Sequence, residues 1–393
     1  MSSTHTSVLS LVMLRRFFAG IGSLREVGPL PANFAKYFQL LAAPDIYKQQ
    51  DKLVKVLHCL TVDYKKRFNP QNITELTTWP AVKSMLTQLP AAIKESNADN
   101  AIKLMRSLSF MRIRDQRVWT ALEKRLSLVL HQTTDESNVV YAIECFQRAG
   151  QDSPRLWNAL ESALLTTICP KHSLSAREVT AVLHAFGVMN KGSQQLLDAM
   201  EQQVLRVATG LQGSDLVKIL NVFAKNKLGG EDLYKSLNRQ CKTVCGQMTA
   251  YEVALALCLF LRMNKTTPDL LERLEEVMKQ AFSQLSFRSV ASVIEAYAGH
   301  LANNTLTPGP RRDFILFLCQ ETFKVYNPLL SKEKEDGTKA LVSFGWGLSV
   351  LRIHHNLALL KRVLTDLRSR DLQDFDRGQL AVIQRFCENV NLP

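Results

Sequence analysis

Lysine and arginine side chains recur at similar places along this 393-residue chain, two to five residues after an aromatic residue that ends an apolar run. Six of them are Arg148, Lys191, Lys225, Lys227, Arg262 and Lys265. Ammonium and guanidinium groups bind phosphate by charge, so a row of them can follow the backbone of single-stranded RNA. Cations near a helix C-terminus also complement the helix dipole, so a purely structural role for the row stays open.

Two further groups of basic residues lie in the first third of the chain. They are Arg112, Arg114 and Arg117, and the compact run Lys65, Lys66 and Arg67. Residues 1–130 hold 19 basic and nine acidic side chains, which gives +10 of the chain's net charge of +13. A polyanion would therefore be attracted mainly to this end of the chain, over a Debye length of about 8 Å.

Residues that could catalyse a reaction or bind a metal do not form a recognisable set in the sequence. Cys241 and Cys245 are spaced to face one another on a helix, but no second Cys or His pair follows at the spacing of a zinc site. His354 and His355 are adjacent, so on a helix they would point in different directions. No metalloprotease, nucleophile-elbow, phosphate-loop or kinase motif occurs. We therefore predict no enzymatic activity, no metal, no cofactor and no small-molecule substrate.

A repeating unit of 37–40 residues carries most of these basic residues. In the first segment of each unit, an aromatic residue or Leu is followed by apolar residues three and seven positions later, and often by Glu at the fourth. Five units open at Trp119, Trp157, Leu197, Tyr234 and Leu271. Positions 0, 3 and 7 share one face of an α-helix, so each first segment is predicted to be an amphipathic helix.

The second segment of each unit ends on an aromatic residue. These residues are Phe146, Phe186, Phe223, Phe260 and Tyr297, at successive spacings of 40, 37, 37 and 37 residues. Apolar residues three, four and seven positions earlier give the period of a second helix. One such hairpin cannot bury its apolar stripe alone, whereas stacked hairpins share a continuous core. Burial of one Phe or Trp side chain contributes about 2–3 kcal/mol, so these aromatic residues are predicted to lie in the core.

The predicted fold is all-α: an α-solenoid of stacked helical hairpins with a period of about 37–40 residues. A single repeat domain is predicted over residues 31–393, with a terminal cap at 33–70, core repeats at 79–300 and weaker repeats at 311–393. Within the weaker repeats, the sequence Gly345-Trp346-Gly347 is predicted to mark a tight crossing of helices. No apolar run is long enough to span a membrane, so no membrane partner is predicted.

The unit length, the opening seen from Trp157 to Glu161, and the Val-to-Phe second helix resemble the helical-hairpin repeats of organellar RNA proteins. These are the heptatricopeptide and octotricopeptide repeats and the related arrays of FAST-kinase-like proteins, and the resemblance covers roughly residues 79–390. With its N-terminal sequence Met-Leu-Arg-Arg-Phe at residues 13–17, the chain is also similar to kinetoplastid mitochondrial proteins of RNA editing or mitoribosome assembly. The resemblance implies two kinds of partner: single-stranded RNA, either mitochondrial mRNA or guide RNA, and other protein subunits of a large ribonucleoprotein complex.

Residues 1–30 are predicted to be a mitochondrial targeting segment. The first acidic residue is Glu26, and Arg15 and Arg16 stand within a stretch that is apolar and rich in Ser and Thr. We therefore expect the protein in the mitochondrial matrix.

Two functions stay open from the sequence. The basic first third favours a non-catalytic RNA-processing factor that binds RNA along its helical surface. Residues 131–310 carry 17 basic and 17 acidic side chains, which favours the alternative. That alternative is a protein-binding scaffold or a mitoribosome assembly factor with no direct RNA contact.

Overall fold

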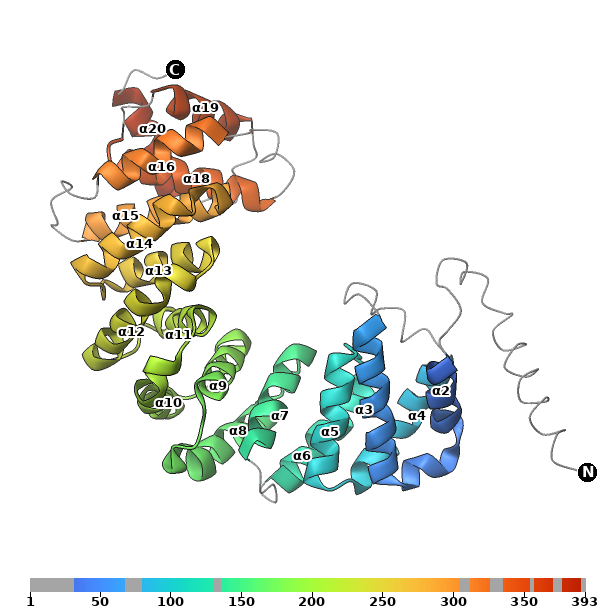
Figure 1. The fold of residues 1–393 in the computed structure, drawn as a ribbon. Helices are drawn as coiled ribbons and strands as arrows, with labels where there is room; N and C mark the ends of the chain where they lie inside the picture. The colour runs from blue at the N-terminus through green and yellow to red at the C-terminus, as the bar shows by residue number, and fades with distance from the viewer. Residues whose placement is uncertain are drawn as a thin grey trace, which may run out of the picture. The chain divides into compact units, whose positions relative to one another are not determined.

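The computed structural model describes residues 32–67, 80–130, 136–303, 312–325, 335–353, 357–369 and 377–389. Across these ranges the chain folds into helices without a strand, and consecutive helices pack against one another (Figure 1). The predicted all-α, solenoid-like fold is therefore confirmed. The predicted targeting segment, residues 1–30, lies outside the described residues. No helix in the described ranges is both long and apolar enough to cross a membrane.

The chain divides into two compact units, residues 1–151 and 152–393. The helices of the first unit are α2 (Ala32–Ala42), η1 (Pro44–Lys48), α3 (Gln50–Arg67), α4 (Pro80–Glu95), α5 (Ala98–Phe110), α6 (Gln116–Val129) and α7 (Glu136–Ala149). They form two rows, because α2, α4 and α6 pack in succession while α3, α5 and α7 pack in succession beside them. The predicted terminal cap corresponds to α2, η1 and α3.

The second unit repeats the two-row arrangement. Its α-helices are α8 (Pro154–Ala163), α9 (Ala176–Met189), α10 (Gln194–Val207), α11 (Gly213–Asn226), α12 (Glu231–Val244), α13 (Ala250–Met263), α14 (Pro268–Gln280), α15 (Phe287–Asn303), α16 (Arg312–Val325), α18 (Glu335–Val350), α19 (Leu357–Arg368) and α20 (Arg377–Asn389). One row runs through α9, α11, α13, α15, α18 and α20, and α10, α12 and α14 pack in the other.

Single-turn helices fill several connections within the second unit. They are η4 (Leu164–Ile168), η5 (Cys169–Lys171), η6 (Ala208–Gly210), η7 (Cys245–Gln247) and η8 (Phe282–Gln284). The last three follow α10, α12 and α14, the first helices of their hairpins, and lead into the second helix of the same hairpin. The three hairpins α10–α11, α12–α13 and α14–α15 therefore share the same kind of connection between their two helices.

The core is built on the aromatic residues that end the second helices. Phe146, Phe186, Phe223, Phe260 and Tyr297 are all at most 1% exposed, as predicted. Within the first unit the Trp119 ring lies edge-on to the ring of Phe146, with centroids 5.7 Å apart. Within the second unit Trp157 packs in the same way on Phe186 at 4.9 Å. Edge-to-face pairs of this kind add to the burial of apolar area.

In two hairpins, the aromatic residue that opens the first helix also donates a hydrogen bond to the backbone of the preceding turn. Nε1 of Trp119 donates to the carbonyl oxygen of Ile113 at 2.8 Å, and the hydroxyl of Tyr234 donates to the carbonyl oxygen of Leu228 at 2.9 Å. In both cases the acceptor lies six residues upstream. Trp and Tyr suit this position because they combine a large apolar ring with one donor that finds a buried partner.

The Glu at the fourth position of a unit links one hairpin to the next. In α8, Oε1 of Glu161 accepts from the backbone N–H of Ser193 at 3.1 Å, and in α10, Oε1 of Glu201 accepts from Gly230 at 2.8 Å. Ser193 and Gly230 are the N-cap residues of α10 and α12. Each carboxylate therefore lies at the N-terminus of the first helix of the next hairpin, where its charge also complements the helix dipole.

Replacing Glu201 by alanine is expected to lower the free energy of unfolding by about 1 kcal/mol, because the Gly230 N–H loses its acceptor. Urea unfolding followed by circular dichroism measures the change. The neighbouring Gln202 is exposed, and Gln202→Ala should change stability by less than about 0.5 kcal/mol. Equal effects of the two substitutions would contradict a role for Glu201 between hairpins.

Candidate nucleic-acid interface

The second helices α5, α7, α9, α11, α13 and α18 end in the same way. At each end one residue has a left-handed backbone: Arg112 (φ 51°), Gly150 (φ 68°), Asn190 (φ 54°), Lys227 (φ 54°), Asn264 (φ 53°) and Arg352 (φ 52°). The residue after it donates its N–H to the carbonyl five positions back, as Leu228 does to Phe223 at 3.0 Å. This is the Schellman ending, which satisfies the last carbonyl groups of a helix. Within each unit, the predicted row of cations lies at these endings.

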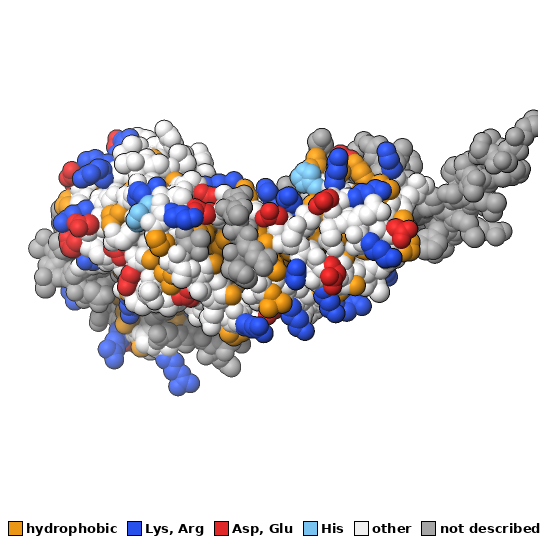
Figure 2. All heavy atoms as spheres, turned by 90° about the horizontal axis from the view of Figure 1, so that it is seen from below, with side chains coloured by type: hydrophobic (Ala, Val, Ile, Leu, Met, Phe, Trp, Pro, Cys, Tyr) orange, Lys and Arg blue, Asp and Glu red, His pale blue; other side chains and the backbone are white. Residues whose placement is uncertain are grey.

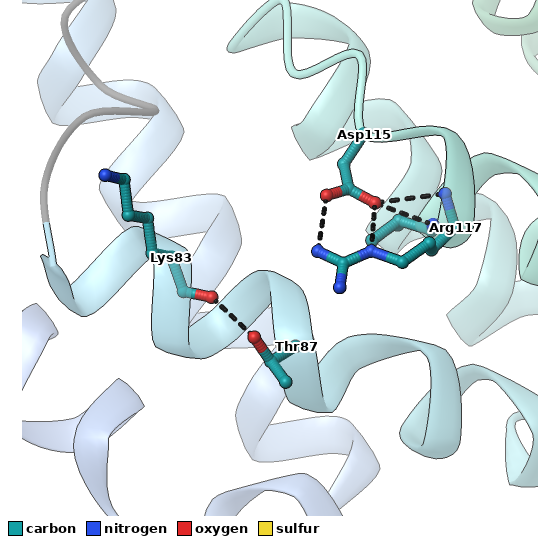
Figure 3. Close-up of polar contacts among 5 residues, drawn as sticks. Lys83, Thr87, Asp115 and Arg117 are labelled. Carbon is teal, nitrogen blue, oxygen red and sulfur yellow. Dashed lines mark hydrogen bonds and ion pairs between the residues drawn. The ribbon is translucent and has the colours of Figure 1, made fainter.

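In the first unit, Arg112 and Arg114 are exposed, and neither makes an ion pair with another described residue. Arg117 differs, because its guanidinium is turned back onto Asp115, the N-cap residue of α6 (Figure 3). Nη2 of Arg117 lies 2.9 Å from Oδ2 of Asp115, and this bond lowers the pKa of Asp115. Two of the three predicted arginines are therefore free to meet an anion.

Arg148 lies in the last turn of α7 and is partly engaged within the first unit. Its Nη2 is 3.5 Å from Oε1 of Glu144, and its guanidinium carbon is 5.7 Å from the centre of the Phe110 ring. These contacts leave 43% of the Arg148 side chain accessible to solvent. Arg148 can therefore still approach a phosphate while keeping its position on α7.

Most of the predicted cations in the second unit have acidic partners. The pairs are Lys191 with Asp152 at 2.8 Å, Arg262 with Glu295 at 3.7 Å, and Lys265 with Glu231 at 3.7 Å. Nζ of Lys225 donates to the carbonyl oxygen of Gly187 at 3.3 Å. Lys227 makes no ion pair within the described part of the chain. In this unit, three of the five predicted cations are therefore paired with a carboxylate.

The run Lys65, Lys66 and Arg67 forms the last turn of α3. The side chains of these three residues lie outside the described ones. Their role in phosphate binding stays a prediction.

A second basic feature of the first unit was missed from the sequence. A groove of about 520 Å³ lies between α3 and α5, and Lys55, His58, Lys103 and Arg106 line it. The two basic residues of each helix are three positions apart and so share one face. This spacing is present in the sequence, but only the pairing of α3 with α5 brings the two faces together.

The cysteines are packing residues of the core. Seven of the eight are buried, and burial raises the pKa of the Cys241 and Cys258 thiols to about 12. Such thiols stay protonated near neutral pH and are poor nucleophiles and ligands. Among the described residues, no three His, Cys, Asp or Glu side chains come together in a way that could hold a metal ion.

The charged surface mixes both signs. Figure 2 shows Lys and Arg side chains spread over one face, with Asp and Glu side chains between them. Chemically, such a surface can bind a polyanion where cations are unpaired and bind acidic or basic protein surfaces where they alternate.

The comparison with protein families bears on which of these partners, a polyanion or another protein, the surface binds. Residues 80–268 match the model of RESC6, the RNA-editing substrate-binding complex 6 protein. The RESC6 match runs from the start of α4 to the start of α14 and includes all the predicted cations except the three at the end of α3. It supports the predicted relation to the RNA-editing machinery, whereas the likeness to heptatricopeptide and octotricopeptide arrays stays a prediction. A search of curated proteins finds no match to the chain.

Replacing Lys227 by glycine is expected to raise the free energy of unfolding by about 0.5–1 kcal/mol. A left-handed backbone costs an L-residue about 1–2 kcal/mol, while glycine adopts it freely and loses only part of that gain to chain entropy. Lys225 carries the same charge two residues earlier but lies within α11, so Lys225→Gly should lower stability by about 1 kcal/mol. Chemical denaturation of both variants checks the signs, and two losses of equal size would refute the conformational cost at Lys227.

Proposed function

We propose that the protein is a non-catalytic subunit of a mitochondrial complex that binds RNA-editing substrates. The RESC6 match over residues 80–268 is the observation that carries this proposal. The name of this family refers to an RNA-editing substrate-binding complex, which agrees with the targeting segment predicted at residues 1–30. The family match and the predicted targeting segment together support a location in the mitochondrial matrix.

Within that complex, the protein contacts single-stranded RNA through the first unit. Arg112 and Arg114 are exposed and make no ion pair with another described residue, so binding a phosphate there breaks no existing contact. Arg112 also occupies a left-handed position that Gly150, Asn190 and Asn264 fill in other hairpins at lower conformational cost. An arginine at such a position supports a role for its side chain beyond folding.

The second unit makes mainly protein contacts. Its predicted cations Lys191, Arg262 and Lys265 already have acidic partners. A phosphate of RNA would have to displace these carboxylates before it could bind. The same observation favours a second candidate function. That candidate is a scaffold, either in the editing complex or in mitoribosome assembly, whose contacts are all with protein.

Ultraviolet crosslinking of the tagged full-length protein in isolated mitochondria separates the two candidates. We expect crosslinked guide RNA or edited mRNA, together with protein subunits that are partly lost after RNase treatment. Co-purified proteins that resist RNase, with no crosslinked RNA, would reject direct RNA contact and support the scaffold. Crosslinks confined to ribosomal RNA would contradict both candidates, since neither includes contact with ribosomal RNA.

A further inference from the structure

The groove between α3 and α5 has basic residues on both walls. Lys55 and His58 line it from α3, and Lys103 and Arg106 line it from α5. Residues three positions apart on a helix rise by about 4.5 Å, so each wall presents its cations one turn apart. All four side chains are exposed. The groove therefore has Lys55 on one wall and Lys103 and Arg106 on the other, with His58 beside Lys55.

The charge of the groove is only partly compensated. Asp51 is the one acidic residue among those that line it, and one of its oxygens accepts from Nδ2 of Asn100 at 3.0 Å. Neither Lys55 nor Lys103 makes an ion pair with another described residue. Two free ammonium groups and one guanidinium thus face a single carboxylate, which favours an anionic ligand.

Aromatic rings lie at the α5 side of the groove. The guanidinium of Arg106 lies over the Tyr141 ring of α7, with its carbon 4.1 Å from the ring centre. This cation–π contact orients the guanidinium while leaving its N–H groups free to donate. Phe110 is half-buried and lines the groove one turn further along α5. Cations beside an aromatic ring are the usual combination for binding single-stranded nucleic acid.

The floor of the groove offers little to read a base edge. The hydroxyl of Thr61 donates to the carbonyl oxygen of Leu57 at 2.7 Å, and the Asn100 amide is engaged with Asp51. Polar atoms already bonded within the protein discriminate poorly between bases. Recognition here would come from phosphate charge and ring stacking, which tolerate many sequences.

We propose that this groove binds consecutive nucleotides of single-stranded RNA, with Lys55, Lys103 and Arg106 on the phosphates and Phe110 against a base. This binding mode rests on the proposed function and adds a site that the predicted row of cations does not contain. His58 contributes a further donor on the α3 wall. The contacts are independent of the base sequence, so RNAs of different composition share the groove.

The test compares two double variants of the full-length protein by fluorescence anisotropy with a labelled single-stranded oligouridine. Lys103→Gln with Arg106→Gln removes two cations from the groove. Lys83→Gln with Lys94→Gln removes two exposed cations from α4, outside the groove, and serves as the matched control. We expect the groove variant to lose about tenfold or more in affinity and about 1.4 in the slope of log K against log salt, at about 0.7 per phosphate contact. The control should stay close to the unaltered protein.

A third variant, Phe110→Leu, keeps an apolar side chain and removes the ring. It should weaken binding without changing the salt slope, because stacking carries no charge. Unaltered protein that binds while the groove variant behaves like the α4 control would overturn the groove but leave the proposed function standing. Failure of the unaltered protein to bind would overturn both. Melting temperatures of all variants show whether a lost affinity comes from lost folding.

Discussion

Replacing Trp119 by alanine is expected to lower the free energy of unfolding by about 3–5 kcal/mol. The Trp119 side chain is 0% exposed and packs on Phe146 in the core of the first unit. Alanine leaves a cavity and removes the donor that satisfies the carbonyl oxygen of Ile113. Both effects act in the same direction, so this substitution should be among the most damaging single changes in the chain.

Trp119→Phe separates the two contributions. Phenylalanine keeps an aromatic ring against Phe146 but leaves the Ile113 carbonyl without its indole partner, a loss of about 1–3 kcal/mol. Urea unfolding of the full-length protein, followed by far-ultraviolet circular dichroism, measures both variants. A loss below about 1 kcal/mol for alanine would mean that the aromatic residues do not carry the core.

Replacing Gly347 by alanine is expected to cost about 1–3 kcal/mol despite the better helix propensity of alanine. A methyl group at Gly347 in α18 would lie 2.7 Å from Cγ2 of Ile294 and 3.2 Å from the Ile294 carbonyl group in α15. The side-chain atom can rotate away, but the backbone carbonyl cannot. The helices must therefore separate, which loosens the packing between α15 and α18.

Gly299 in α15 provides the matched control, because a methyl group there meets nothing within 4 Å. Gly299→Ala should raise stability by about 0.5–1 kcal/mol, since alanine loses less chain entropy than glycine. Thermal unfolding of the two variants should shift in opposite directions. Two shifts of the same sign would contradict the close crossing at Gly347.

The hairpins and their core were predictable because their determinants are local and repeated. The spacing that ends on Phe186, Phe223 and Phe260 is a property of the chain itself, and it fixes which helix face is buried. The close crossing at Gly347 was also predicted, since glycine in a helix is costly unless a neighbour needs the space. The Glu201 pattern was visible, but its bond to Gly230 depends on how one hairpin stacks on the next.

The candidate interface was harder to predict because charge pairing is not local. Lys191 meets Asp152 and Lys265 meets Glu231 across separations of more than 30 residues, and no sequence spacing aligns them. The groove has the same origin, since Lys55 and Lys103 face each other only when α3 and α5 pack together. Sequence therefore supplied the cations, and the stacking of hairpins decides which of them remain available.

The first unit is proposed to bind RNA through unpaired cations, and the salt dependence of RNA affinity measures how many of them meet a phosphate. Five phosphate contacts, from Lys55, Lys103, Arg106, Arg112 and Arg114, predict a slope of about −3.5 for log K against log salt. Affinity of the purified full-length protein for single-stranded RNA should then fall about a hundredfold between about 50 and 200 mM salt. Absence of binding, or an affinity that stays constant across this range, would contradict the account.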